Sequence, residues 1–233
     1  MMRLLVSAAS AADAAAALEG GADFIDAKNP FAGALGAVTP DTFAGIVAAV
    51  GDARPVTAAL GDAVSAASVE ADARMFAALG ATLVKIAISG AETLADAHAF
   101  AASAVRGARA GRPNASVVLV AYADRPHGTV SPIALLDVAS AAGAAGVLLD
   151  TVDKRGPRLT ELATLAWLTE WTGHAHRRSL SVALAGRLLA DDLPIVRLCG
   201  ADVAGVRGAA CEGGRKGRIV ADAVRGLRIA QGS

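Results

Sequence analysis

Gly21-Ala22-Asp23-Phe24-Ile25-Asp26-Ala27-Lys28, residues 21–28, joins a glycine-led turn to a short apolar run that ends in charged residues. The same pattern starts again at Gly80, Gly143 and Gly200, at spacings of 59, 63 and 57 residues. Each glycine is predicted to end a helix, because glycine adopts the left-handed backbone conformation at little cost. Each spacing holds two strand–helix units, so the four runs are predicted to be the even-numbered strands of eight.

Apolar runs alternate with alanine-rich amphipathic stretches along the whole chain. We predict strands at residues 3–7, 22–28, 55–60, 83–88, 116–123, 146–151, 180–186 and 202–207. We predict helices at residues 10–19, 41–50, 66–79, 91–110, 131–142, 158–174, 188–199 and 216–230. This alternation favours parallel strands covered by helices. Eight units in 233 residues fit an α/β protein with one domain, a (β/α)8 TIM barrel over residues 1–233. A doubly wound open sheet with fewer strands is the alternative.

Composition narrows the class of protein. Hydrophobic residues make up 54% of the chain but aromatic residues only 3%, so alanine, valine and leucine must fill the core. A formal net charge of zero argues against nucleic acid or an anionic membrane as the main partner. Cys199 and Cys211 form no C-x-x-C pair, which fits a reducing cytoplasm. The apolar start of the chain is too short for a signal peptide, and charged residues interrupt the helical stretches, so we expect no membrane span.

Lysine is rare: only Lys28, Lys85, Lys154 and Lys216 occur among 22 basic residues. Because arginine carries most of the positive charge, a lysine is expected where arginine cannot serve. Only the amine loses its proton near neutrality and attacks a carbonyl carbon. Lys28 and Lys85 lie in predicted strands and Lys154 follows one, which indicates Schiff-base or proton-transfer chemistry. Lys216 belongs to the basic cluster 215–218, and we expect it at the surface, or at most in a peripheral role that attracts phosphate.

Counting forward from the repeat glycines places charged residues on one face. Asp26 and Lys85 lie five residues on, and Lys28, Asp150 and Arg207 lie seven residues on. Offsets five and seven share a face because strand side chains alternate, and alternate strands supply each interior layer of a barrel. We therefore expect these side chains to meet near the C-terminal ends of the strands, where barrel enzymes hold their active sites.

Two simpler interpretations stay open for these charges. The buried groups could be ion pairs that fill the barrel, although apolar residues would often be as stable there. Lys154 could lie on an exposed loop beside Arg155. Asp124 is expected to face the pocket, and His127 is expected in a solvated loop. The sequence has no histidine or cysteine pattern typical of metal sites, so we predict neither metal nor cofactor.

A second group of residues suggests phosphate binding. Gly186 and Arg187 follow the seventh predicted strand, and Arg207-Gly208-Ala209 end the eighth. The loops after these two strands are the recurrent phosphate site of such barrels. Glycine allows backbone N–H groups to approach an anion, and arginine adds a bidentate donor. The loop at residues 29–36 is either a second anion cradle or a plain surface turn.

At these residues the chain resembles the (5-formylfuran-3-yl)methyl phosphate synthases, also known as 4-(hydroxymethyl)-2-furancarboxaldehyde-phosphate synthases of methanofuran biosynthesis. The resemblance runs nearly from end to end and is most specific around Lys28 and Arg207. The segments that carry it are Leu4-Leu5-Val6-Ser7, residues 20–23, 25–30, 33–36 and 61–62, the Lys85 strand, and residues 121–124, 149–151, 183–186 and 205–211.

The resemblance implies a carbon–oxygen lyase that acts on phosphates. It joins two molecules of glyceraldehyde 3-phosphate, a phosphorylated triose, cyclises and dehydrates the product, and releases one phosphate. It also implies that Lys28 forms the Schiff base and that Asp26, Lys85, Asp150 and Lys154 complete the functional set. The family has valine where this chain has Ala27, a position that we expect to face outward. The alternatives are a class I aldolase for another phosphorylated sugar and a non-catalytic barrel that binds a sugar phosphate. A homo-oligomer is compatible with all three of these functions.

Overall fold

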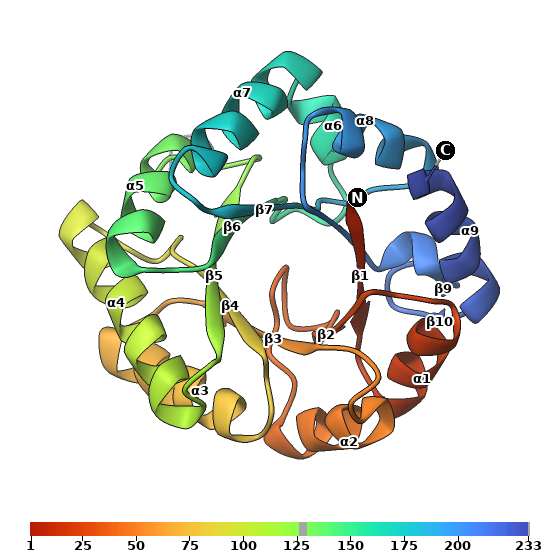
Figure 1. Cartoon of the computed structure of the whole chain (residues 1–233), viewed down its shortest axis with the longest axis horizontal. Helices are drawn as coiled ribbons and strands as arrows, with labels where there is room; N and C mark the ends of the chain where they lie inside the picture. Colours follow the sequence, from red (N-terminus) through yellow and green to blue (C-terminus); the bar gives the residue numbers. More distant parts are fainter. Residues whose placement is uncertain (126–129, 233) are drawn as a thin grey trace.

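The computed structural model describes residues 1–125 and 130–232, and over these residues eight parallel strands close into a barrel (Figure 1). Each strand pairs with the next in the chain, and β8 pairs with β1, so no open edge is left. This topology confirms the predicted (β/α)8 barrel and excludes the open sheet. The strands are β1 (Arg3–Ala8), β2 (Phe24–Ala27), β3 (Val56–Asp62), β4 (Leu83–Ala87), β5 (Ser116–Tyr122), β6 (Gly146–Asp150), β7 (Ser181–Leu184) and β8 (Val203–Val206).

The helices form a ring outside the barrel (Figure 1). They are α1 (Ala11–Glu19), α2 (Pro40–Val50), α3 (Ala66–Ala78), α4 (Leu94–Gly111), α5 (Pro132–Ala142), α6 (Leu159–Leu162), α7 (Leu165–His176), α8 (Leu193–Leu198) and α9 (Ala221–Gly232). A serine or threonine hydroxyl accepts a backbone N–H at the start of α1 to α5 and of α7, which satisfies one of the free donors there.

Three predicted helices differ from the structure. The one predicted at 158–174 is two helices, because Thr164 caps a second start. The one predicted at 188–199 begins as the 3-10 turn η1 (Ala190–Asp192). The one predicted at 216–230 begins only at Ala221, after a second 3-10 turn, η2 (Gly208–Ala210), and a small hairpin of β9 (Cys211–Glu212) and β10 (Arg218–Ile219).

Side chains alternate between two separate apolar layers. Strand residues such as Ile25 and Ala27 pack outward against the helices in the larger layer. Leu148, Val118 and Leu35 belong to the smaller layer inside the barrel. Ala27 therefore faces outward, as predicted. The four repeat glycines all have positive φ, between 70° and 113°, which confirms their left-handed conformation. Within the described residues, no helix combines the length and the apolar character that crossing a membrane requires.

Phe43 provides a test of the outer layer. It is fully buried on α2 and meets Phe76 of α3 edge to face, with ring centroids 5.2 Å apart. Phe43→Ala is expected to lower the free energy of unfolding by about 3–5 kcal/mol, because a cavity replaces the ring. Phe31, which is 69% exposed, is the matched control, and Phe31→Ala should cost no more than about 1 kcal/mol. Urea unfolding measures both, and equal losses would contradict this packing.

Candidate active site

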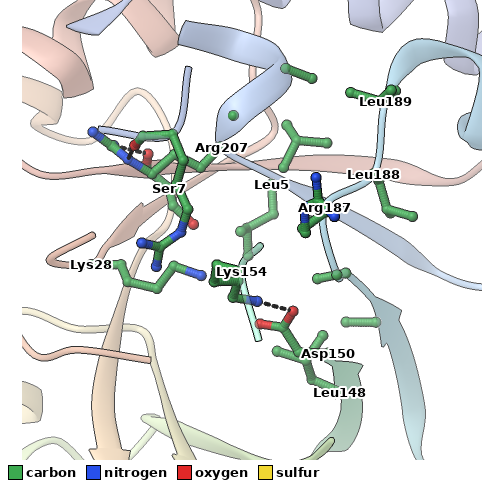
Figure 2. A pocket seen from close by; sticks show the side chains of 18 of the residues that line it. Leu5, Ser7, Lys28, Leu148, Asp150, Lys154, Arg187, Leu188, Leu189 and Arg207 are labelled. Carbon is green, nitrogen blue, oxygen red and sulfur yellow. Dashed lines mark hydrogen bonds and ion pairs between the residues drawn. The ribbon is translucent and has the colours of Figure 1, made fainter. Parts of the chain in front are cut away.

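A cavity of about 340 Å³ opens at the C-terminal ends of the strands. Its volume is in the range of small-molecule sites. Lys28, Lys85, Asp150 and Lys154 line it together. Figure 2 shows the side chains of Lys28, Asp150 and Lys154 around it. The even strands therefore direct their charged side chains into one volume, in the register that the glycine count predicted. Asp26 lies just behind the wall and is completely buried.

The first ion pair lies deep in the barrel. Lys85 Nζ on β4 is 2.6 Å from Asp26 Oδ1 on β2, and both side chains are buried. Thr57 Oγ1 donates to the same Oδ1 at 2.8 Å, and Ser7 Oγ donates to Oδ2 at 3.0 Å. Three neighbouring strands thus hold the Asp26 carboxylate in one orientation. A buried ammonium with a fully bonded carboxylate is suited to orienting a substrate or supplying a proton.

The second ion pair lies at the end of β6. Lys154 Nζ is 2.6 Å from Asp150 Oδ1, which also accepts the Thr151 backbone N–H at 2.8 Å. Lys154 is only 14% exposed, so it does not lie on an exposed loop. Burial alone would raise the pKa of Asp150, but the ammonium groups of Lys154 and Lys28 and the Thr151 amide lower it overall. Asp150 Oδ2 is buried and has no hydrogen-bond partner among the described residues.

Lys28 is the amine without a counter-ion. It follows β2, is 8% exposed, and extends its Nζ into the cavity between the flanking side chains (Figure 2). Among the described residues, no carboxylate lies within ion-pair distance of this nitrogen, unlike Lys85 and Lys154. Burial lowers the pKa of Lys28 from 10.5 to about 8; Asp150 and Asp26 oppose this shift, while Lys154 and Lys85 add to it. At neutral pH roughly a tenth of the molecules therefore carry the neutral, nucleophilic amine.

The loop after β7 has a strained backbone at the cavity wall. Gly186 has a φ of 112°, and a Cβ there would lie 3.0 Å from Thr151 Cγ2. Arg187 has a φ of 59°, which is unusual for a residue with a side chain and is commonly found at functional sites. Both line the cavity, as do Gly208 and Ala209 from the loop after β8. The structure thus brings the predicted phosphate loops to the same cavity as the lysines.

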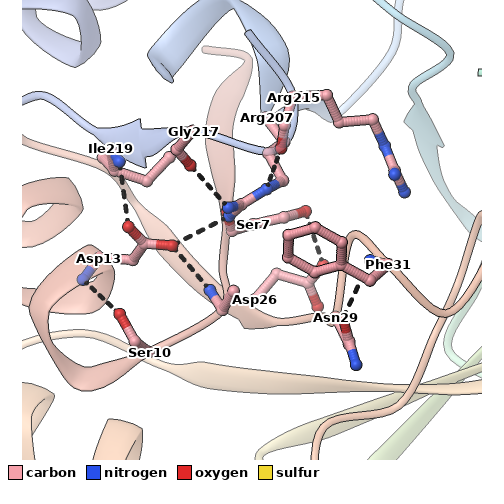
Figure 3. Close-up of polar contacts among 11 residues, drawn as sticks. Ser7, Ser10, Asp13, Asp26, Asn29, Phe31, Arg207, Arg215, Gly217 and Ile219 are labelled. Atoms are coloured by element: carbon pink, nitrogen blue, oxygen red, sulfur yellow. Dashed lines mark hydrogen bonds and ion pairs between the residues drawn. The ribbon is translucent and has the colours of Figure 1, made fainter. Parts of the chain in front are cut away.

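Arg207 lines the cavity, but its guanidinium binds the protein itself (Figure 3). Nη1 donates to the Ser7 carbonyl at 2.7 Å and lies 3.1 Å from Asp13 Oδ2. Nε and Nη2 donate to the carbonyls of Arg215 and Gly217. Four of its five N–H groups therefore have protein acceptors, and this geometry favours a role in holding the β8 loop over the predicted role in phosphate binding.

Comparison with known proteins places similar sequences over nearly the whole chain in one family. A sequence model of the 4-HFC-P synthase family matches residues 4–228. The (5-formylfuran-3-yl)methyl phosphate synthase of Methanopyrus kandleri is 38% identical over 218 residues, 93% of this chain and 92% of that protein. The protein of the same name from Methanocaldococcus jannaschii is 35% identical over 97% of this chain and 98% of its own. This chain belongs to the 4-HFC-P synthase family.

Solved structures with the same fold are more distant from this synthase-family chain. A 3-hexulose-6-phosphate synthase superposes with a TM-score of 0.64 at 23% identity, over 98% of this chain and 99% of that one. KGPDC from Streptococcus mutans superposes with a TM-score of 0.69 at 14% identity, over 100% and 98%. At these identities the likeness establishes the barrel fold alone.

One charged residue of the cavity wall was not predicted from the sequence. Arg215 belongs to the basic cluster 215–218 and was not singled out there, yet it lines the cavity, and its guanidinium donates to the carbonyls of Pro30 and Gly33. Lys216 beside it is exposed as expected, 5.2 Å from the Phe31 ring centroid. The loop at residues 29–36 thus turns these two carbonyls toward a cation, where an anion cradle would present N–H groups. No local sequence signal distinguishes Arg215 from its neighbours.

The remaining candidates contribute less. Asp124 does not line the cavity; its carboxylate accepts the backbone N–H groups of Val152 and Asp153 and so shapes the loop that carries Lys154. His127 lies outside the described residues. Burial raises the pKa of the Cys211 thiol, which agrees with a packing role. Among the described residues, no group of histidine, cysteine and acidic side chains is arranged to hold a metal ion.

Asp26→Asn tests the deep ion pair. It should lower the free energy of unfolding by about 3–5 kcal/mol, because Lys85 would keep a buried charge without its counter-ion. Asp26→Asn combined with Lys85→Met should recover much of that loss in urea unfolding. Asp52→Asn, at an exposed turn, is the control and should stay within about 0.5 kcal/mol of the parent. Additive losses in the double variant would show that the two groups are not coupled.

Proposed function

We propose that this chain condenses two molecules of glyceraldehyde 3-phosphate through a Schiff base on Lys28 to form (5-formylfuran-3-yl)methyl phosphate. Atoms balance when one phosphate and two waters leave the two trioses. The observation that carries the proposal is the unpaired, buried Lys28 amine with a pKa of about 8. The product is inferred from the family to which this chain belongs, and the reaction mechanism is inferred from the residues of the cavity.

Lys28 supplies the nucleophile. The neutral amine attacks a triose carbonyl carbon, and loss of water leaves an iminium. The iminium withdraws electrons from the adjacent C–H bond, so removal of that proton gives an enamine that attacks the second triose. Hydrolysis later returns the amine, so the imine water is not part of the net balance. A permanently charged arginine could not perform the first step.

The second ion pair provides proton transfer. Asp150 lines the cavity and its carboxylate is ionised, so it can accept the substrate C–H proton. Lys154, which bonds Asp150 Oδ1, can then return a proton to a departing hydroxyl group. The Asp26–Lys85 pair lies deeper and is suited to orienting the substrate oxygen with the Lys85 ammonium. Each acid or base of this kind typically contributes ~10²–10⁴-fold in rate.

The charge of the cavity supports phosphorylated substrates. Six cationic side chains line it in the described structure, against one carboxylate, Asp150. Asp26 and Asp13 neutralise Lys85 and Arg207 from behind the wall. A cationic excess of three remains, which favours anions such as triose phosphates. Arg187 and the glycine loops after β7 and β8 are the groups that we assign to one phosphate.

Incubation of the purified protein with glyceraldehyde 3-phosphate alone tests the proposal. Mass spectrometry should identify the furan phosphate, with ultraviolet absorbance of the conjugated aldehyde rising in parallel with free phosphate. An aldolase for another phosphorylated sugar would yield a carbon–carbon condensation product without that absorbance. Saturable binding without turnover would leave only a binding protein and would contradict the proposal.

Lys28→Ala and Asp150→Asn separate the two proposed roles. Lys28→Ala should abolish the covalent adduct that borohydride traps from triose phosphate. Asp150→Asn should still form the adduct but slow turnover by ~10²–10⁴-fold, since a proton acceptor is lost. Peptide mapping of the trapped protein by mass spectrometry measures the first effect and steady-state kinetics the second. An adduct that persists at another lysine in Lys28→Ala would refute the nucleophile assignment.

Arg187→Ala tests the phosphate loop. Loss of the guanidinium should raise KM for glyceraldehyde 3-phosphate by about 10-fold or more, since charge-assisted hydrogen bonds contribute about 1.5–3 kcal/mol. Arg187→Gly is the matched variant, because glycine accepts the φ of 59° without strain. Both variants should raise KM alike. A rise in Arg187→Ala alone would assign the effect to the backbone and not to the guanidinium.

A further inference from the structure

Arg215 lies at the tip of the β9–β10 hairpin, and its main chain is firmly held (Figure 3). Its carbonyl accepts Arg207 Nε at 2.8 Å, and the Gly217 carbonyl accepts Arg207 Nη2 at 3.1 Å. Asp13 on α1 accepts the Ile219 backbone N–H at 3.0 Å and pairs with Arg207. The Asp13–Arg207 pair thus ties the hairpin to the barrel and sets where the Arg215 side chain begins.

The Arg215 guanidinium is oriented from the opposite side of the cavity mouth. Nη1 donates to the Pro30 carbonyl, and Nη2 donates to the Gly33 carbonyl at 2.8 Å. Both acceptors lie in the loop that directly follows Lys28. These bonds use two of five N–H groups, and the described structure gives the other three no protein acceptor. The loop that follows Lys28 thus holds the guanidinium at the cavity wall and leaves three of its N–H groups available to a ligand.

The charge on Arg215 has no counter-ion within the described residues. Lys85, Lys154 and Arg207 each pair with an aspartate, whereas the ion pairs of the described chain include neither Arg215 nor Arg187. Arg187 is exposed to solvent, but Arg215 is half-buried. Burial lowers the pKa of Arg215, and the Asp150 carboxylate, which lies beyond ion-pair distance, only partly opposes this shift. A half-buried cation without a partner is costly unless an anionic ligand completes it.

Arg187 and Arg215 reach the cavity from different places. Arg187 follows β7, while Arg215 contacts the loop after β2, three strands further round the barrel through β8 and β1. In Figure 2, Arg187 and Lys28 approach the cavity from opposite sides. A phosphate at Arg187 therefore leaves Arg215, on the Lys28 side, free for a second anion.

We infer that Arg215 binds a second phosphoryl group, so that the cavity holds a six-carbon bisphosphate between Arg187 and Arg215 with Lys28 alongside. This rests on the proposed function, because joining two triose phosphates produces a bisphosphate before one phosphate leaves. The planar guanidinium suits this role, since its free edge can donate two parallel bonds to phosphate oxygens. The two loop carbonyls hold the other edge.

Glucitol 1,6-bisphosphate and glucitol 6-phosphate test the inference, because neither has a carbonyl group and neither forms an imine. Isothermal titration calorimetry should show that the parent protein binds the bisphosphate about 10–100-fold more tightly than the monophosphate. Arg215→Gln should remove this preference and change monophosphate affinity by less than about threefold. Arg112→Gln is the matched control: Arg112 likewise donates to a glycine carbonyl, that of Gly80, but at the other end of the barrel. It should keep the preference.

An equal loss of affinity for both ligands in Arg215→Gln would show that Arg215 only supports the loop, and would overturn the inference. If Arg215→Gln fails to fold, the neutral variant Arg215→Met takes its place, and a preference for the bisphosphate at the parent level in that variant also overturns the inference. The ligand test is independent of turnover. A lost preference without furan formation by the parent would support the bisphosphate site and contradict the proposed function. Furan formation by the parent, together with an intact preference in Arg215→Gln, would support the proposed function and contradict the bisphosphate site.

Discussion

The site depends on the burial of the Lys28 amine, which lowers its pKa from 10.5 to about 8. Lys85 and Lys154 share the cavity, and each pairs with an aspartate at 2.6 Å. Within the described residues no carboxylate pairs with Lys28. Asp150 and Asp26 oppose the lowering of its pKa while the other two ammonium groups add to it, so burial decides the outcome and leaves this amine partly neutral near pH 7.

The barrel fold allows charged side chains to be buried next to a well-packed apolar layer. Strand alternation sends Ala27 to the outer layer and its neighbours Asp26 and Lys28 inward, so one short strand supplies both apolar contact and chemistry. Hydroxyl groups of Ser7 and Thr57 donate to the buried Asp26 carboxylate. The Ser7 carbonyl also accepts a hydrogen bond from Arg207, which links the deep ion pair to the loop after β8.

Sequence patterns predicted the parts of the molecule that depend on local periodicity. The glycine repeat and the two-residue alternation located the strands within a few residues and predicted that Lys28, Lys85 and Asp150 meet at one cavity, with Asp26 just behind its wall. The β9–β10 hairpin was missed because its strands are two residues long and show no periodicity. Two of the four partners of Arg207, Ser7 and Asp13, lie 200 and 194 positions away, so its role depends on tertiary structure that no local motif encodes.

The central claim is that Lys28 is neutral for part of the time at neutral pH. Because the chain has only four lysines, carbon-13 labelling of their ε-carbons gives few enough NMR signals to titrate, and Lys28→Arg assigns one of them. The signal lost in Lys28→Arg should titrate with a midpoint near pH 8. A midpoint at the ordinary value of 10.5 would contradict it, because the amine would then be fully charged whenever substrate arrives.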